Sequence, residues 1–259
     1  MILDRIVADK KDELEDTRAR IPLKDIKYMA RDIWPTRDFA SALMDPDKVN
    51  IIAEVKKASP SKGIIRVDFD PVEIAWTYEM NGAKALSVLT EKRYFMGDLD
   101  YIRAIRPKVC LPILRKDFIF DEYQVYEARA AGADALLLIA AILDASRMKD
   151  LYMLAKDLGL ETLAEVHDED DLEKVLDAEF SVIGINNRNL KNFKVDIKNT
   201  GRLIKDIPYD RTVVSESGIS TLNDIQYLKK AGADAALIGE ALMREADYGA
   251  KLRELAGFN

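Results

Sequence analysis

Three segments of this 259-residue sequence repeat one pattern, in which a helix end is closed by glycine and a buried strand follows a short turn. They read NGAKALSVLTE from residue 81, AGADALLLIAA from residue 131 and AGADAALIGEA from residue 231. Glycine suits such helix ends because it adopts positive φ at no steric cost. The starts lie 50 and then 100 residues apart. This spacing fits two and then four helix-plus-strand units of about 25 residues each.

Apolar runs of strand length complete this repeat along the chain. They occupy residues 49–55, 85–89, 111–115, 135–139, 161–166, 181–186, 212–217 and 235–239. The segments between them mostly show apolar residues at i, i+3 and i+4, the spacing of an amphipathic helix. Short apolar strands that alternate with helices indicate a parallel sheet buried on both faces, and eight of them favour a closed (β/α)₈ TIM barrel. An open doubly wound sheet is the alternative, although no G-x-G-x-x-G follows the first strand.

One domain is expected to span residues 1–259. The barrel would occupy residues 46–259, and residues 1–45 would form an N-terminal helical extension, because LDRIVADKKDELEDTRARI has the pattern of an amphipathic helix. No linker rich in proline, glycine or serine divides the sequence. Thr221 is a candidate N-cap for the last helix before the final strand.

Composition limits the partners that the protein can have. A net charge of −7 and a pI near 5.0 argue against broad attraction to nucleic acid or to an anionic membrane, so a small phosphorylated molecule is the expected partner. We expect a monomer or a small homo-oligomer. The single cysteine, Cys110, excludes an intrachain disulfide and a cysteine-built metal site, and it suits a reducing compartment. With neither a signal peptide nor a membrane span in the pattern, the cytoplasm is the expected location.

Charged and polar residues gather at the carboxyl ends of the predicted strands, where barrel enzymes place their chemistry. They are Glu54, Lys56, Arg115, Lys116, Asp117, Glu165, Asn186, Asn187, Arg188, Ser215, Glu216 and Ser217. Side chains alternate along a strand, so Glu54 and Lys56 point to the same side. This pair alone could be a structural ion pair. Charges that converge from several strands can instead shift one another's pKa values and supply an acid and a base.

Glycines close the last two predicted strands. Gly218 and Gly239 each precede a helix start, the usual position in a barrel for a phosphate held by backbone amides. The alternative is that these glycines only permit tight turns. His167 is expected in a loop or on the surface, and Cys110 is expected to pack in the core. The run HDEDDLEK resembles a solvated helix start, so no metal site is expected there.

Motifs along almost the whole chain resemble one family, indole-3-glycerol phosphate synthase. The matching segments are IIAEVKKASPSKG, LTEKRYFMGDLDYI, PILRKDFI, AGADALLLIAAIL, LAEVHDEDDLEKVL, GINNRNLKNF and SESGI. The resemblance implies a lyase of tryptophan biosynthesis that uses no cofactor and no metal. Its substrate would be 1-(2-carboxyphenylamino)-1-deoxyribulose 5-phosphate, converted to indole-3-glycerol phosphate, carbon dioxide and water.

The resemblance also implies roles for individual residues. Lys116 would be the general acid of ring closure, Glu165 would transfer a proton during dehydration, and Lys56 would share that acid role or hold the substrate carboxylate. Glu54, Glu216 and Asn186 would position these groups. The substrate and its phosphate would be bound by Arg188, Ser217, Gly218, Gly239 and Ser59, with Phe95, Leu114 and Phe118 as an apolar wall. Glu91 departs from the family, since many relatives have aspartate there.

Two other readings of the sequence stay open. The first is a sibling barrel enzyme such as phosphoribosylanthranilate isomerase, which works with a cysteine and an aspartate at strand ends; Cys110 is misplaced for that role. The second is a barrel without chemistry that binds a phosphorylated ligand or a partner protein. A pure binding protein has no need of Lys56, Lys116 and Glu165 together.

Overall fold

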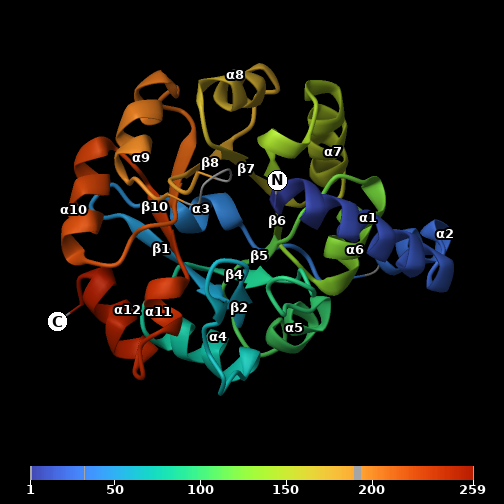
Figure 1. Cartoon of the computed structure of the whole chain (residues 1–259), viewed down its shortest axis with the longest axis horizontal. Coiled ribbons are helices and arrows are strands. Elements are labelled where there is room, and N and C mark those ends of the chain that lie inside the picture. The colour runs from blue at the N-terminus through green and yellow to red at the C-terminus, as the bar shows by residue number, and fades with distance from the viewer. Residues whose placement is uncertain (1, 32, 190–193, 259) are drawn as a thin grey trace.

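Eight parallel strands close into a barrel in the computed structural model, which describes residues 2–31, 33–189 and 194–258 (Figure 1). The order around the ring is β1-β10-β9-β8-β7-β6-β5-β4, so the first and last barrel strands pair and complete the closure. The strands are β1 (Asn50–Val55), β4 (Ala85–Leu89), β5 (Ile113–Lys116), β6 (Ala135–Ile139), β7 (Glu161–Val166), β8 (Val182–Asn186), β9 (Thr212–Glu216) and β10 (Ala235–Ile238). The predicted (β/α)₈ barrel is confirmed.

The strand bounds differ from the prediction most at β5. The apolar run predicts residues 111–115, whereas the strand begins at Ile113 and includes Lys116. Pro112 lacks an N–H group and so cannot extend the ladder as a donor, although its carbonyl accepts from Leu86. The shift makes Lys116 part of the strand, where the backbone fixes the direction of its side chain.

A second, small sheet follows β1 that the sequence pattern does not predict. Strands β2 (Ala58–Ser59) and β3 (Gly63–Ile64) form an antiparallel hairpin within the long loop after β1. Strand β3 begins at Gly63, whose φ of +65° is a conformation that suits glycine. The N–H of Ala58 donates to the carbonyl of Phe95 at 3.2 Å, which joins this hairpin to the loop after β4.

Helices surround the barrel and cover its outer face (Figure 1). They are α4 (Pro71–Met80), α5 (Leu99–Ile105), α6 (Glu122–Ala131), α7 (Ala145–Asp157), α8 (Glu169–Asp177), α9 (Lys198–Leu203), α10 (Leu222–Ala231), α11 (Glu240–Met243) and α12 (Tyr248–Ala256). Most begin at an aspartate whose carboxylate accepts backbone N–H groups of the first turn. Thr221 caps α10 as predicted, in a capping box with Asp224.

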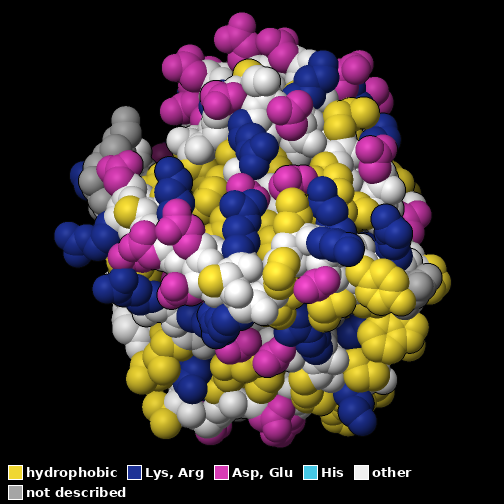
Figure 2. All heavy atoms as spheres, turned by 90° about the vertical axis from the view of Figure 1, so that its right-hand side faces the viewer, with side chains coloured by type: hydrophobic (Ala, Val, Ile, Leu, Met, Phe, Trp, Pro, Cys, Tyr) yellow, Lys and Arg dark blue, Asp and Glu magenta, His cyan; other side chains and the backbone are white. Residues whose placement is uncertain are grey.

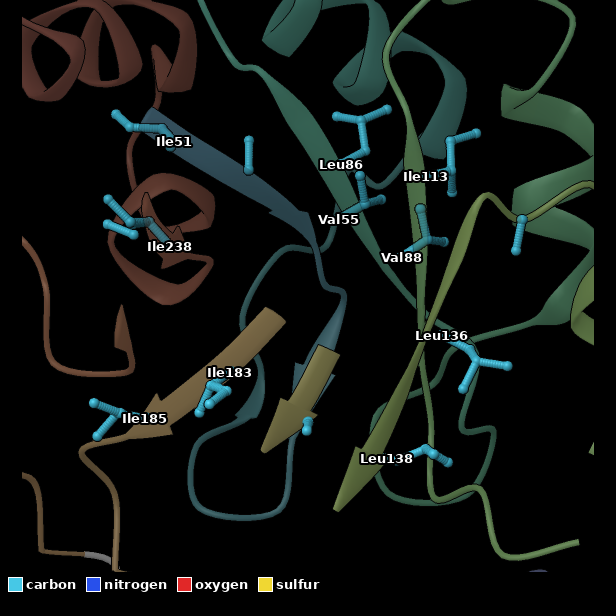
Figure 3. Packing of buried hydrophobic residues seen from close by; sticks show 14 of the residues in the cluster. Ile51, Val55, Leu86, Val88, Ile113, Leu136, Leu138, Ile183, Ile185 and Ile238 are labelled. Carbon is cyan, nitrogen blue, oxygen red and sulfur yellow. The ribbon is translucent and has the colours of Figure 1, made fainter. Parts of the chain in front are cut away.

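The core has two layers because side chains alternate along each strand. The outer layer packs strand residues such as Val88, Leu136 and Ile183 against the helices (Figure 3). The inner layer fills the barrel with residues such as Ile52 and Leu163. Phe39 packs with that inner layer from the short helix α3 (Phe39–Leu43). The barrel interior is thus a packed core, with room for chemistry only at its mouth.

The aspartates of the two AGAD segments join neighbouring strands where the strands begin. Asp134 accepts from the N–H of Ile113 at 2.8 Å, and Asp234 accepts from the N–H of Val213 at 2.7 Å. The preceding glycines, Gly132 and Gly232, cap their helices at φ +90° and +96°. The repeat therefore encodes a helix stop and a hydrogen bond that holds the next strand in register.

Helix α1 (Ile2–Arg20) lies beside the ring of strands, with its N-terminal end over the ring in Figure 1. Its buried Lys10 pairs with Asp117 at 3.1 Å, and its Asp9 contacts Arg93 and Tyr94 of the loop after β4. Helix α2 (Leu23–Met29) continues outward and packs on α6. Ion pairs thus fasten the N-terminal helix to the loops at the carboxyl ends of two strands.

The surface on the side of α1 and α2 carries charges of both signs. Figure 2 shows lysine and arginine side chains interleaved with acidic and apolar ones on this face. Such a mixture gives no single-sign surface there for a nucleic acid or an anionic membrane. Within the described residues, no helix has the length and apolar character to span a membrane.

Candidate active site

A cavity of about 580 Å³ opens at the carboxyl ends of the barrel strands. Most of the candidate residues named from the sequence line it: Glu54, Lys56, Ser59, Phe95, Lys116, Phe118, Glu165, Asn186, Arg188, Glu216, Ser217, Gly218 and Gly239. Leu114, Arg115, Asn187 and Ser215 do not line it, and Leu114 is fully buried in the barrel interior. Leu114 points inward two residues before Lys116, one layer below the cavity. The expectation that Leu114 walls the pocket is therefore wrong.

The carboxylate of Glu54 pairs with the ammonium of Lys56 at the end of β1. The distance from Glu54 Oε2 to Lys56 Nζ is 2.5 Å, and both side chains are largely buried. Ala53 and Val55 belong to the outer core, which is the alternation that the sequence predicts. The two charges enter the cavity from one strand and neutralise each other there.

Lys116 lies between two buried carboxylates from other strands. Its Nζ is 2.7 Å from Glu165 Oε2 and 3.1 Å from Glu216 Oε2. Glu165 comes from β7 and Glu216 from β9, so three strands bring these groups together. The preceding residue, Arg115, faces away from this cluster and donates to Glu127 of α6 at 2.7 Å. The strand alternation thus separates a structural arginine from the lysine in the cavity.

The electrostatics of the cluster give its members different protonation states. Burial lowers the pKa of Lys116, but Glu165, Glu216 and Glu54 outweigh burial and hold that pKa above its ordinary value. Burial would raise the pKa of Glu165, yet Lys116 and His167 bring it down to about 2. Burial and the like charges of Glu165 and Glu54 raise the pKa of Glu216 to about 7, against the pull of Lys116. Glu165 is therefore ionised at neutral pH, and Glu216 exchanges a proton there.

Glycines leave room for two of these carboxylates. A Cβ at Gly184 of β8 would overlap Oε1 of Glu216, and a Cβ at Gly239 would overlap Oε2 of Glu54. Gly239 has φ −125°, so its backbone does not require glycine. The absence of a side chain at both positions lets a glutamate approach the backbone of the neighbouring strand. Gly239 thus has a packing reason beyond a permissive turn.

The two asparagines at the end of β8 have different surroundings. Asn186 lines the cavity and hydrogen-bonds Glu165. Asn187 is buried away from it, where its amide group donates to Ser215 Oγ at 3.0 Å and accepts from Thr200 Oγ1 at 2.9 Å. Asn187 and Ser215 therefore hold the β8 and β9 strand ends to α9, outside the cavity.

The turn after β9 combines two residues with positive φ. Ser217 has φ +69° and Gly218 has φ +78°. Above the turn after β10, Arg188 is 3.7 Å from Glu240, which also pairs with Arg244 at 3.0 Å. Arg244 lines the cavity too and was not predicted. The turns at Ser217–Gly218 and at Gly239 thus line the same pocket as two arginines, with the carboxylate of Glu240 between those arginines.

Phe95 and Phe118 both line the cavity, with their ring centroids 6.2 Å apart. Glu91 supports this wall, because its carboxylate accepts from the backbone N–H groups of Tyr94 at 2.7 Å and Phe95 at 3.0 Å. The glutamate that departs from the family motif therefore shapes the loop that carries Phe95.

Sequence reasoning missed some residues at the cavity. Ile2, Leu3 and Ile6 of α1 line the cavity, and only their apolar spacing near the N-terminus hinted at burial. His167 is not a surface residue: its side chain is 12% exposed and its Nε2 lies 3.4 Å from Glu165 Oε1. Cys110 is exposed and not packed in the core.

The described part of the chain contains no cluster of three or more histidine, cysteine, aspartate or glutamate side chains placed to hold a metal ion. The motif GINNRNLKNF extends into residues 190–193, which lie outside the described residues.

Comparison with known proteins decides the family. The profile of indole-3-glycerol phosphate synthase matches residues 3–255. The chain belongs to the indole-3-glycerol phosphate synthase family. A relative from Acetivibrio thermocellus with that name is 50% identical over 98% of both chains. Another, from Dehalococcoides mccartyi, is 51% identical over 98% of this chain and the whole of its own.

Solved structures outside the family share the barrel. A 3-hexulose-6-phosphate synthase from Salmonella typhimurium superposes with a TM-score of 0.66 at 13% identity, covering 81% of this chain and 98% of its own. A mutant tryptophan synthase alpha-subunit from Pyrococcus furiosus gives 0.62 at 16% identity, covering 83% and 99%. At such low identity these similarities support the fold alone, whereas the relatives in the synthase family support the chemistry.

Proposed function

We propose that this chain converts 1-(2-carboxyphenylamino)-1-deoxyribulose 5-phosphate into indole-3-glycerol phosphate, carbon dioxide and water. The observation that carries the proposal is the meeting of Lys116 with Glu165 and Glu216 in one cavity, at 2.7 and 3.1 Å. This acid–base cluster lies beside turns suited to a phosphate and a wall suited to an aromatic ring. Membership of the synthase family supports the same reaction.

Ring closure is the step that needs an acid. The ring carbon that bears the carboxylate attacks the ribulose carbonyl, a carbon–carbon bond forms, and the carbonyl oxygen gains negative charge. We assign the proton for this oxygen to the Lys116 ammonium. Loss of carbon dioxide then restores the aromatic ring. A fixed ammonium in a largely buried site stabilises the developing charge without having to reorganise water.

Dehydration needs a base and an acid. A proton leaves the intermediate as its hydroxyl departs with a proton to form water. Glu165 enters this step ionised, since its pKa is lowered to about 2, which suits it to receive a proton. The pKa of Glu216 is raised to about 7, so its carboxyl group is suited to take up and release a proton near neutral pH. We leave open whether Lys56 shares the acid role or holds the substrate carboxylate.

Binding of the substrate completes the proposal. Arg188, Ser217, Gly218 and Gly239 would bind the phosphate, with Ser59 reaching in from the β2–β3 hairpin. Phe95 and Phe118 would pack on the anthranilate ring. As the family resemblance implies, we propose that neither a cofactor nor a metal ion takes part. We further propose a cytoplasmic protein that is a monomer or a small homo-oligomer and binds neither nucleic acid nor membrane.

A direct assay tests this function. Purified protein is incubated with the carboxyphenylamino-deoxyribulose phosphate, and the fluorescence of the indole product is followed against time. We expect product to appear together with an equal amount of carbon dioxide. A protein that isomerises phosphoribosylanthranilate, or one that binds the ligand without turnover, would release no carbon dioxide. Either result would reject the proposal.

A further inference from the structure

His167 occupies a position between two carboxylates beside the acid–base cluster. It follows β7 and points to the same side as Glu165, two residues earlier. Its Nε2 lies 3.4 Å from Glu165 Oε1, and its Nδ1 lies 3.5 Å from Asp171 Oδ2 in the first turn of α8. Each ring nitrogen therefore faces one anionic oxygen.

The backbone around His167 is fixed from both sides. Its N–H donates to Asp171 Oδ2 at 3.2 Å, and its carbonyl accepts from Asn199 Nδ2 at 3.1 Å. The same Asn199 amide donates to the carbonyl of Asn186 at 3.1 Å. These contacts join the end of β7 to the start of α8 and to α9, which also holds the end of β8. The backbone of His167 is thus held in place, whereas neither ring nitrogen has a hydrogen-bond partner in the described part of the chain, so the imidazole meets its two carboxylates by charge.

Glu165 uses its two oxygens for different partners. Oε2 accepts from Lys116 at 2.7 Å, whereas Oε1 faces His167. A carboxylate held only at Oε2 could rotate about its last bond, and that rotation would move its second oxygen relative to a bound substrate. We propose that His167 is a positioning residue that fixes the Glu165 carboxylate in the orientation required for proton transfer, with Asp171 orienting the imidazole. This inference rests on the proposed function, because that function assigns the proton transfer to Glu165.

Charge supports the same role. Burial lowers the pKa of His167, but the neighbouring carboxylates of Asp171, Glu165 and Glu216 outweigh burial and hold that pKa above its ordinary value. The groups that face it are the carboxyls of Glu165, Asp171 and Glu216, with the ammonium groups of Lys116 and Lys174 behind them. An imidazolium here places a second cation beside Glu165. That cation is present below the imidazole pKa and is lost as the pH rises through it.

The first test measures the imidazole directly. His167 is the only histidine in the sequence, so its ring gives a single set of nitrogen signals in an NMR titration of the whole protein. We expect a pKa above the ordinary 6.5 in the wild type. Glu165→Gln and Asp171→Asn should each lower it by roughly 1, as expected on loss of a neighbouring opposite charge. An imidazole pKa that is the same in Glu165→Gln as in the wild type would overturn the proposal.

The second test separates positioning from packing. Replacement by glutamine keeps a donor near the Nε2 position, replacement by asparagine keeps one near Nδ1, and alanine keeps neither. We expect His167→Ala to lower kcat roughly 10- to 100-fold, the range typical of groups that orient a reacting residue. KM should change much less, and His167→Gln should recover more of kcat than His167→Asn. A purely structural histidine would give three variants with equal kcat per folded molecule.

A matched control uses the same helix. Asp170 is exposed in the first turn of α8, so Asp170→Asn removes one charge there without touching the imidazole. We expect Asp170→Asn to keep the wild-type kcat, whereas Asp171→Asn lowers kcat. Wild-type kcat in His167→Ala would overturn the proposal. A wild type that does not turn over the substrate would instead reject the proposed function, while the NMR titration would still test the contact.

Discussion

Both ends of the barrel bury carboxylates, but only the end where the strands begin satisfies them completely. Asp134 accepts from the N–H groups of Arg37 and Ile113 and from the guanidinium of Arg106. Glu216 at the mouth is equally buried, yet its Oε1 has no hydrogen-bond partner in the described part of the chain. An unsatisfied buried polar atom costs about 1–3 kcal/mol. The carboxylates at the end where the strands begin therefore stabilise the fold. The mouth keeps a carboxyl group available for proton exchange.

This contrast predicts that changes at the mouth act mainly on turnover and changes at the end where the strands begin act mainly on stability. The largest effect is expected for Lys116→Ala. Removal of the proposed general acid should lower kcat by about 10²–10⁴, the range for one acid–base group. Steady-state assays with saturating substrate measure it. Lys108→Ala, which removes an exposed lysine away from the cavity, should leave kcat unchanged. Equal kcat in the two variants would contradict the role of Lys116.

At the opposite end, Asp134→Asn should destabilise the fold. The change leaves the buried guanidinium of Arg106 without its anion, which costs about 3–5 kcal/mol for a buried pair that loses one partner. Urea unfolding measures the loss, and kcat per folded molecule should stay at the wild-type value. Asp234→Asn is the matched control, since Asp234 accepts from Val213 but forms no ion pair with an arginine among the described residues. We expect this control to lose roughly 1–2 kcal/mol of stability. Equal losses in the two variants would show that the ion pair with Arg106 does not contribute.

A smaller effect on stability is expected from Gly184→Ala at the mouth. The new methyl group would overlap Glu216 Oε1, so either the carboxyl or β8 must shift, at a cost of about 1–3 kcal/mol for overpacking. Because Glu216 moves away from Lys116, kcat should fall as well. Gly257→Ala is the control for kcat only: no atom lies within 4 Å of its Cβ position, but its φ of +73° strains alanine and so lowers stability by itself. If Gly184→Ala behaves like that control in kcat, the spacing of Glu216 does not matter for turnover.

The pH dependence of stability gives the smallest and most specific signal. The pKa of Glu216 is about 7 in the folded protein against an ordinary 4.5, so the folded state binds more protons than the unfolded chain between these values. Stability from this group is therefore lost as the pH rises through that window. The free energy of unfolding of Glu216→Gln, taken relative to that of the wild type, should therefore rise by roughly 1–3 kcal/mol as the pH increases from the lower to the upper end of the window. Urea unfolding at both ends measures the gain; a constant difference between the proteins would show that Glu216 titrates normally.

Local patterns predicted most of the barrel. Burial on both faces makes each strand visible as an apolar run, and glycine marks the preceding helix end, so Ala135–Ile139 and Glu161–Val166 match their predicted bounds. Alternation also gave the correct side for Glu54 and Lys56. Leu114 was placed one layer too high, because a sequence gives the direction of a side chain but not its depth in the barrel.

Contacts between distant elements were beyond the reach of the sequence pattern. Ile2 and Ile6 line the cavity from a helix whose Lys10 pairs with Asp117 after β5, more than 100 residues along the chain. His167 looked like a loop residue because its burial depends on the approach of α8. The short β2–β3 hairpin has too few residues to show a period.

The two places where a glycine backbone receives a glutamate have an evolutionary consequence. The carboxyl group of Glu216 occupies the space that a side chain at Gly184 would need. The carboxyl group of Glu54 does the same at Gly239. Neither position can drift alone. In homologous sequences a larger residue at either glycine position should be accompanied by a shorter one at its partner, so the two pairs should covary across the family.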